Sequence, residues 1–112
     1  MIGGNIKGEI QIKKSVPNEI GEQILAWETV DEVKGFLDLQ TGESKYRSYN
    51  AKIEESSHIF ICDYKALNEL ITNENSRMVV KGAIYDIKFI DNPMGLNKHL
   101  EFYLKFTGGQ NE

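Results

Sequence analysis

Apolar and polar residues alternate along most of this chain, a pattern that is typical of β-strands with one buried face. Over residues 6–12, every second residue is isoleucine or glycine and the residues between them are polar. A second strand is expected to begin near Trp27 and to end at Leu39, with a bend where Gly35 lets two backbones approach closely. Residues 15–21 combine proline, asparagine and glycine without a period, so we expect a loop there.

The second half of the chain carries further strand patterns. Residues 58–62 are rich in β-forming side chains, and residues 77–80 and 83–90 are two such runs separated by Lys81 and Gly82. A lysine-glycine pair between two strands predicts a tight hairpin, because glycine accepts positive φ. The clearest alternation is over residues 100–106, which we expect to form the last strand.

Two segments have helical spacing instead. In residues 43–53 the apolar positions are Tyr46, Tyr49 and Ile53, spaced three and four apart, which predicts a short amphipathic helix. Residues 65–72, which follow Asp63 as a potential cap, are expected to form a helical connector.

These elements together predict a mainly β protein. We expect a small antiparallel β-barrel or sandwich of five or six strands, with one short mid-chain α-helix and long loops. The whole chain, residues 1–112, is expected to be one domain with flexible ends at about residues 1–5 and 107–112. The side chains expected in its core are those of Trp27, Leu37, Leu39, Ile61, Tyr85, Ile87, Phe89, Phe102 and Leu104.

Charge narrows the functional classes. The chain has 13 Lys and Arg residues against 17 Asp and Glu residues, a formal net charge of −4. A protein whose main work is to grip phosphates needs clustered cations, so the composition argues against that class. The apolar runs are far too short to cross a bilayer, and no secretory signal is expected.

Little in the sequence indicates catalysis. His58 and Cys62 lie four residues apart on one expected strand face, which leaves a small Cys–His hydrolase conceivable, but no third member is indicated. We expect Cys62 to be a buried thiol and His99 to be solvated. One cysteine can form no internal disulfide and cannot supply a zinc site. No catalytic, cofactor-binding or metal site is expected, because the residues of the chain show no pattern for one.

A basic and aromatic cluster is the best indication of nucleic-acid binding. Lys45, Tyr46 and Arg47 are adjacent, and small oligonucleotide-binding barrels stack bases on such aromatic side chains. A tyrosine stripe on a helix more often packs against a sheet or a partner. The nucleic-acid-binding barrel therefore stays an alternative.

The order of these features resembles the head-closure, or head-tail joining, proteins of long-tailed bacteriophages. The resemblance covers roughly residues 6–106 and lies in the order and spacing of its features. In this chain the stations are the strand at 6–12, Trp27, the turn Thr41, Gly42 and Glu43 that starts a short helix, the strand at 58–62, the run from Arg77 into Gly82-x-x-Tyr85-x-Ile87, the turn Asp91, Asn92 and Pro93, and the strand at 100–106.

The resemblance implies a structural virion protein. Such a protein assembles as a ring beneath the portal and adaptor, usually following the dodecameric portal, closes the DNA-filled head and presents the docking surface for the tail. Its partners would be the portal and adaptor proteins, the tail-completion protein and its own copies, with packaged DNA passing through the ring. It would be made in the host cytoplasm and end in the virion, and we expect a monomer in isolation.

The resemblance also indicates contact residues. The segment after the second strand carries the ring-facing or channel-facing loop in the family, so the subunit or partner contact candidates here are Lys45, Tyr46, Arg47, Tyr49 and Ile53. The expected loop at residues 16–23 is a second candidate surface. A tail-completion or minor capsid protein with the same small barrel is the alternative role within this class.

Overall fold

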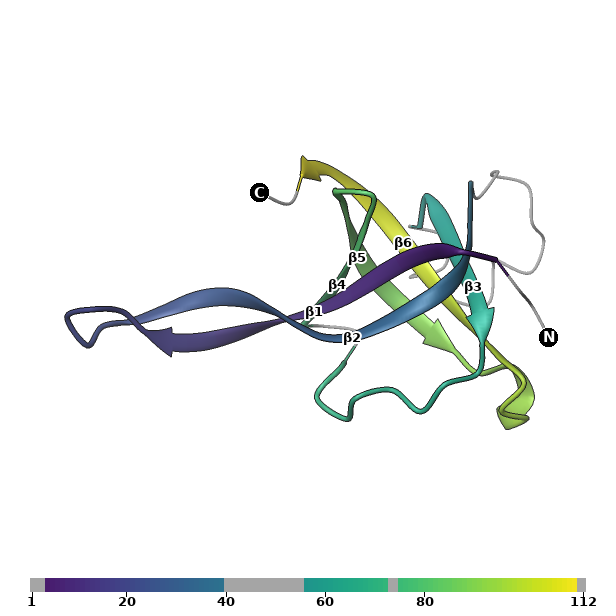
Figure 1. The fold of residues 1–112 in the computed structure, drawn as a ribbon, viewed down its shortest axis with the longest axis horizontal. Helices are drawn as coiled ribbons and strands as arrows, with labels where there is room; N and C mark the ends of the chain where they lie inside the picture. Colours follow the sequence, from purple (N-terminus) through teal and green to yellow (C-terminus); the bar gives the residue numbers. More distant parts are fainter. Residues whose placement is uncertain (1–3, 40–55, 73–74, 111–112) are drawn as a thin grey trace.

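Six antiparallel strands close into one barrel (Figure 1). The computed structural model describes residues 4–39, 56–72 and 75–110. The order around the barrel is β1-β2-β3-β6-β5-β4. The elements are β1 (Ile6–Pro17), β2 (Gln23–Leu39), β3 (His58–Asp63), β4 (Ser76–Val80), β5 (Ala83–Asp91), the short 3-10 turn η2 (Pro93–Gly95) and β6 (His99–Gln110). The predicted mainly β architecture is confirmed, and the helix expected at residues 43–53 lies outside the described residues.

The first strand closes the barrel because it pairs on both sides. One edge of β1 pairs with β2, with Gly8 opposite Val33, and the other edge pairs with β4, with Gly8 opposite Val80. Closure leaves the barrel strands without a free edge, which removes the usual site of unwanted strand pairing.

The core is built by the inward half of each strand. Side chains on a strand alternate between its two faces, so Phe60 of β3 and Phe102 of β6, which pair directly, both point inward. Their rings lie 6.3 Å apart in an edge-to-face arrangement. The largest fully buried side chains are those of Phe60, Phe102, Ile10, Met78, Ile87, Leu104, Val80 and Cys62.

Five of the expected core residues lie in or against this cluster. Ile87, Phe102 and Leu104 are fully buried, Tyr85 is buried, and Leu37 is half-buried and packs against the cluster. These five occupy inward positions on β2, β5 and β6.

Four other expected core residues lie elsewhere. Leu39 ends β2 with 62% of its surface exposed. Ile61 points outward because its neighbours Phe60 and Cys62 point inward. A β-bulge between Ile87 and Phe89 reverses the alternation, so Phe89 pairs with outward-facing Tyr103. Trp27 lies beyond the barrel body, as described below.

The prediction of a helical connector at residues 65–72 is wrong, because residues 64–72 contain no helix. The Asn68 backbone N–H donates to Oδ2 of Asp31 on β2 at 2.9 Å, and the Lys65 ammonium bonds Oδ1 of the same carboxylate. The Asn68 side chain accepts a bond from the Leu70 backbone N–H, a local arrangement that competes with helix. Leu67 and Ile71 pack against the core cluster, so this segment covers it.

The predicted extent of the loop, residues 15–21, is also wrong. β1 and β2 stay paired as far as Pro17 opposite Gln23, and only residues 18–22 turn. Oδ1 of Asn18 accepts bonds from the backbone N–H groups of Ile20 and Glu22, and Gly21 takes the positive φ (+87°) that the turn requires. Residues 13–28, which we call the arm, therefore form a two-stranded ribbon that projects from the barrel (Figure 1).

Gly35 lies at the close approach that the sequence analysis expected. A Cβ on Gly35 would lie 2.0 Å from the backbone oxygen of Ile61, whereas a Cβ on Gly8 would meet only the flexible end of Met78 at 2.7 Å. We expect Gly35→Ala to lower the free energy of unfolding by more than about 3 kcal/mol and Gly8→Ala by about 1 kcal/mol. Urea denaturation of the two variants measures this, and equal losses would contradict it.

Asp31 is expected to hold the covering segment in a pH-dependent way. Burial raises the pKa of this carboxyl, but hydrogen bonds from Lys65, Asn68 and Glu32 outweigh that effect, so the pKa lies below its ordinary value. A lowered folded-state pKa gives stabilisation that is present above the unfolded-state pKa and is lost as the pH falls through the folded-state pKa.

We therefore expect Asp31→Asn to reduce the free energy of unfolding by about 1 kcal/mol at pH 7. The difference from the parent should shrink steadily toward pH 3, as measured by urea denaturation across that range. Glu32→Gln, which changes the adjacent and more exposed carboxylate, is the control and should have little effect. A loss for Asp31→Asn that is the same at pH 3 and pH 7 would disprove this account.

Candidate interaction surface

The possible catalytic pair does not come together. Cys62 and His58 both face inward but lie at opposite ends of β3, about 13 Å apart at the usual rise per strand residue. Burial, assisted by the charge of Asp63, raises the pKa of the Cys62 thiol to about 11, so it is protonated at neutral pH. The His58 ring packs edge-on against Tyr85 at 5.1 Å. Both residues are parts of the packed interior.

His99 was expected to be solvated, but its side chain has a partner. Its Nε2 lies 3.0 Å from a carboxylate oxygen of Glu101, whose other oxygen accepts a bond from the Tyr103 hydroxyl at 2.7 Å. Burial and the charge of Glu101 raise the pKa of Asp91, which pairs with Glu101 across β5 and β6. Among the described residues no group of three or more His, Cys, Asp or Glu side chains could hold a metal ion.

In the described part of the chain, no helix is both long and apolar enough to span a bilayer.

The arm is a prominent surface of the described chain. The molecule measures 51 Å along its long axis but only 27 Å and 24 Å across, and the arm accounts for much of that elongation (Figure 1). Its exposed apolar side chains include Ile20 at the turn, 78% exposed, and Leu25, 67% exposed. An isolated two-stranded ribbon is only marginally stable in water, so the arm gains stability when another surface covers it. Exposed apolar side chains that lie together are typical of a contact surface.

The two faces of the arm differ in charge. One face carries Lys14 and Glu28, whose ion pair of 2.6 Å leaves it neutral, together with Val16, Ile24 and Ala26. The other face, which we call the Leu25 face, is lined by Lys13, Ser15, Pro17, Gln23, Leu25 and Trp27, and its described residues include a cation but no acid. The turn beyond both faces is acidic, with Glu19 and Glu22 exposed.

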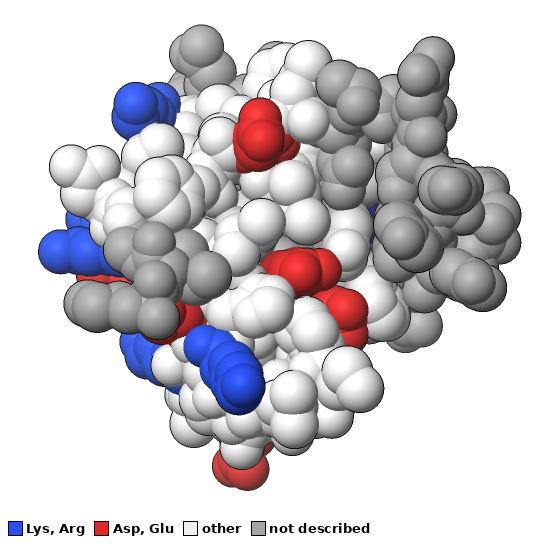
Figure 2. Space-filling model, turned by 90° about the vertical axis from the view of Figure 1, so that its right-hand side faces the viewer, with Lys and Arg blue, Asp and Glu red and all other residues white. Residues whose placement is uncertain are grey.

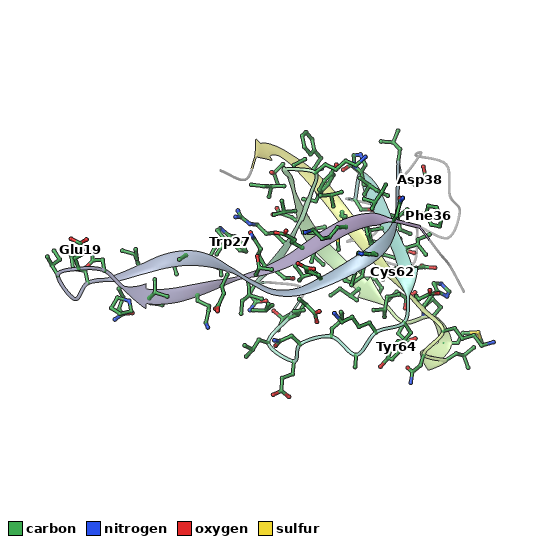
Figure 3. The ribbon with its side chains drawn as sticks, in the orientation of Figure 1. Glu19, Trp27, Phe36, Asp38, Cys62 and Tyr64 are labelled. Atoms are coloured by element: carbon green, nitrogen blue, oxygen red, sulfur yellow. The ribbon has the colours of Figure 1, made fainter. Side chains whose placement is uncertain are left out.

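Trp27 anchors the arm where it leaves the barrel (Figure 3). The Arg77 guanidinium of β4 lies 4.1 Å from the centre of the Trp27 ring, and the Lys13 ammonium lies 5.4 Å from it. Nε of Arg77 donates to Oε1 of Gln11 at 2.7 Å. Burial lowers the pKa of Arg77 while the charge of Asp86 raises it, and an arginine with this surrounding keeps its positive charge. The base of the Leu25 face is therefore positive and aromatic.

A second apolar surface lies on the outside of the barrel. Phe36 of β2, Ile59 and Ile61 of β3 and Tyr103 of β6 follow one another across neighbouring strands and all point outward, and we call them the outer patch. Phe36 is 49% exposed and the other three are half-buried. Figure 3 places Phe36 and Asp38 at the end of the molecule opposite Glu19 of the arm.

Figure 2 views the molecule from the side opposite the arm. The middle of this side is largely uncharged with acidic groups among the uncharged ones, and the basic groups lie on the left and in the lower part of the view (Figure 2). The register places Asp38 beside Ile59 and Glu101 beside Ile61, so carboxylates accompany the outer patch.

The contact candidates from the sequence fall in a segment that the structure does not describe. Lys45, Tyr46, Arg47, Tyr49 and Ile53 all lie outside the described residues, and their role stays a prediction. The second candidate, residues 16–23, does fall on the arm. The ribbon itself was missed, although the turn residues Asn18 and Gly21 between Val16 and Ile24 were a usable hairpin signal.

Comparison with known proteins identifies a family. A family model described as phage head completion protein matches residues 4–105, which is most of the chain. A search of curated proteins finds no match.

The buried thiol gives a direct test of the interior. At pH 8 we expect native Cys62 to react with a thiol reagent about 100-fold more slowly than the unfolded chain, because it is 2% exposed and its pKa is about 11. The reaction is followed by absorbance with a chromogenic disulfide. The variant Phe36→Cys is the control, since its added thiol lies on the surface and should react at once. A fast reaction of the parent protein would show that the barrel opens readily.

Proposed function

Because this chain belongs to the phage head completion protein family, we propose that it closes the DNA-filled head beneath the portal and adaptor and offers the tail its docking surface. The family is one of structural virion proteins, so the chain has a structural role in head closure and meets other head or tail proteins of the phage. The finer steps are the proposal: a ring of its own copies that follows the dodecameric portal, contact with the adaptor and the tail-completion protein, and passage of DNA through the ring.

The observation that carries the proposal is the division of the molecule into a closed body and exposed contact surfaces. The barrel is rigid in the sense that every strand in it is paired on both sides and its centre is filled by fully buried side chains. The arm and the outer patch lie on different sides of that body. A component that joins neighbours needs these two things, a body that keeps its shape and surfaces that its neighbours can cover.

The net charge is compatible with a conduit for DNA. A ring through which a polyanion slides must not bind it tightly, and a chain with a net charge of −4 offers few of the clustered cations that tight binding needs. We further propose that Lys45, Tyr46, Arg47, Tyr49 and Ile53 contact neighbouring subunits or the adaptor, and that the chain is a monomer in the host cytoplasm until it assembles into the virion.

The proposal is tested by placing a stop codon early in this gene of the phage or prophage that carries it. We expect complete tails to accumulate beside tailless heads that have lost their DNA, as seen by negative-stain microscopy of the lysate. Supplying the intact gene in trans is the control and should restore joined particles.

Other outcomes point to other roles. DNA-filled heads beside defective tails would place the chain at the upper end of the tail, in the tail-completion role. Normal particles would contradict a structural role in the virion. Salt-dependent binding of the purified protein to DNA at micromolar concentration would favour the nucleic-acid-binding barrel instead.

A further inference from the structure

A ring of identical copies requires two different surfaces on each copy, one for each neighbour. Such head-to-tail contacts are heterologous, because a patch on one subunit meets a different patch on the next, and they close into a ring when the rotation between copies allows it. Two of the apolar surfaces in the described part of this chain lie on opposite sides, the Leu25 face of the arm and the outer patch.

Charge follows the same order along both surfaces. On the Leu25 face the order is cationic at the base, with Lys13 and the Arg77 guanidinium over Trp27, then apolar at Leu25, then acidic at the turn. On the outward face of β2 the order is Lys34, Phe36 and Asp38, which is again cationic, apolar and acidic. All of the charged groups at the ends of these two series are exposed apart from Arg77, which is half-buried.

The two series share the spacing between their cationic or aromatic position and their apolar position, and the acidic turn of the arm lies further out. Residues two apart on a strand lie about 7 Å apart, which separates Trp27 from Leu25 on the arm and Phe36 from both Lys34 and Asp38 on β2. Placed side by side in opposite directions, the base of the arm would meet Asp38, Leu25 would meet Phe36, and the acidic turn with Glu19 and Glu22 would lie toward Lys34. Placed in the same direction, like charges would meet at both ends.

We infer that the Leu25 face of the arm of one copy docks on the outer patch of the next copy. The base of the arm lies at Asp38 of that copy and the turn of the arm lies toward its Lys34. This inference rests on the proposed function, because it identifies the contact that joins neighbours in the ring. The opposite face of the arm, whose Lys14 and Glu28 neutralise each other, stays outside the contact.

The inference is tested by cysteine cross-linking in assembled particles. The native chain has one thiol, Cys62, which is buried and protonated, so introduced cysteines are the reactive ones. With Leu25→Cys and Phe36→Cys in the same chain, mild oxidation should produce a ladder of cross-linked multimers on a denaturing gel. Ile24→Cys with Phe36→Cys is the matched control, because Ile24 is the neighbour of Leu25 on the other face, and it should give at least about fivefold less product.

A charge exchange adds a second test. Lys13→Glu and Asp38→Lys should each lower the yield of infectious particles about tenfold or more, and the two together should recover most of that loss, as expected for groups that meet across an interface. Circular dichroism of each purified variant shows that it is folded. If Leu25→Cys fails to fold, Gln23→Cys on the same face replaces it.

Several results would overturn the inference. A cross-link from Leu25→Cys to a different virion protein, identified by mass spectrometry, would assign the arm to that partner. Equal products from the Leu25 and Ile24 pairs would show that the Leu25 face makes no specific contact between copies. The absence of product in complete particles would show that Leu25 and Phe36 of neighbouring copies do not meet. Dimers formed by Leu25→Cys alone would indicate a two-fold contact. These outcomes are distinct from failure of the proposed function, which is judged on particles that lack the chain altogether.

Discussion

The structure depends on a mismatch of strand lengths around a closed barrel. β1 has 12 residues and β2 has 17, but β4, which closes the barrel against β1, has only five. β1 meets β4 from Gly8 to Ile12, and beyond that point β2 is the strand with which β1 stays paired among the described residues. The two long strands therefore leave the barrel together, and the arm follows from the closure of the body.

The position of Trp27 shows how this exit is stabilised. A ribbon that leaves a barrel has no neighbour to cover its faces, so its first residues need anchoring contacts to the body. Trp27 supplies them because its ring lies beneath a guanidinium that comes from the short strand β4, and that guanidinium is in turn bonded to Gln11 of β1. Trp27, which the sequence predicts as a core residue, therefore stabilises the boundary between the body and the arm.

Much of the barrel could be predicted because alternation is a local property. Ile87, Phe102 and Leu104 are buried as their period-two pattern requires. Phe89 departs from the pattern because of one extra residue in β5, which a single sequence does not mark, and Ile61 departs because its neighbours Phe60 and Cys62 are apolar as well. The covering segment could not be predicted locally. Leu67, Leu70 and Ile71 have helical spacing, but the segment is not helical. Its backbone is held instead by a hydrogen bond from Asn68 to Asp31, which is 37 residues away in the sequence.

The free edges of the arm have a consequence for the chain before it meets any partner. Both strands of the ribbon expose backbone groups that another chain could pair with, and a ribbon of this kind is the usual starting point for fibrous aggregation. Pro17 has no N–H to offer, and Lys13, Lys14 and Glu28 place charge along the ribbon, where it opposes stacking of many copies. The arm thus has gatekeeper residues of the kind that oppose edge-to-edge association of exposed strands.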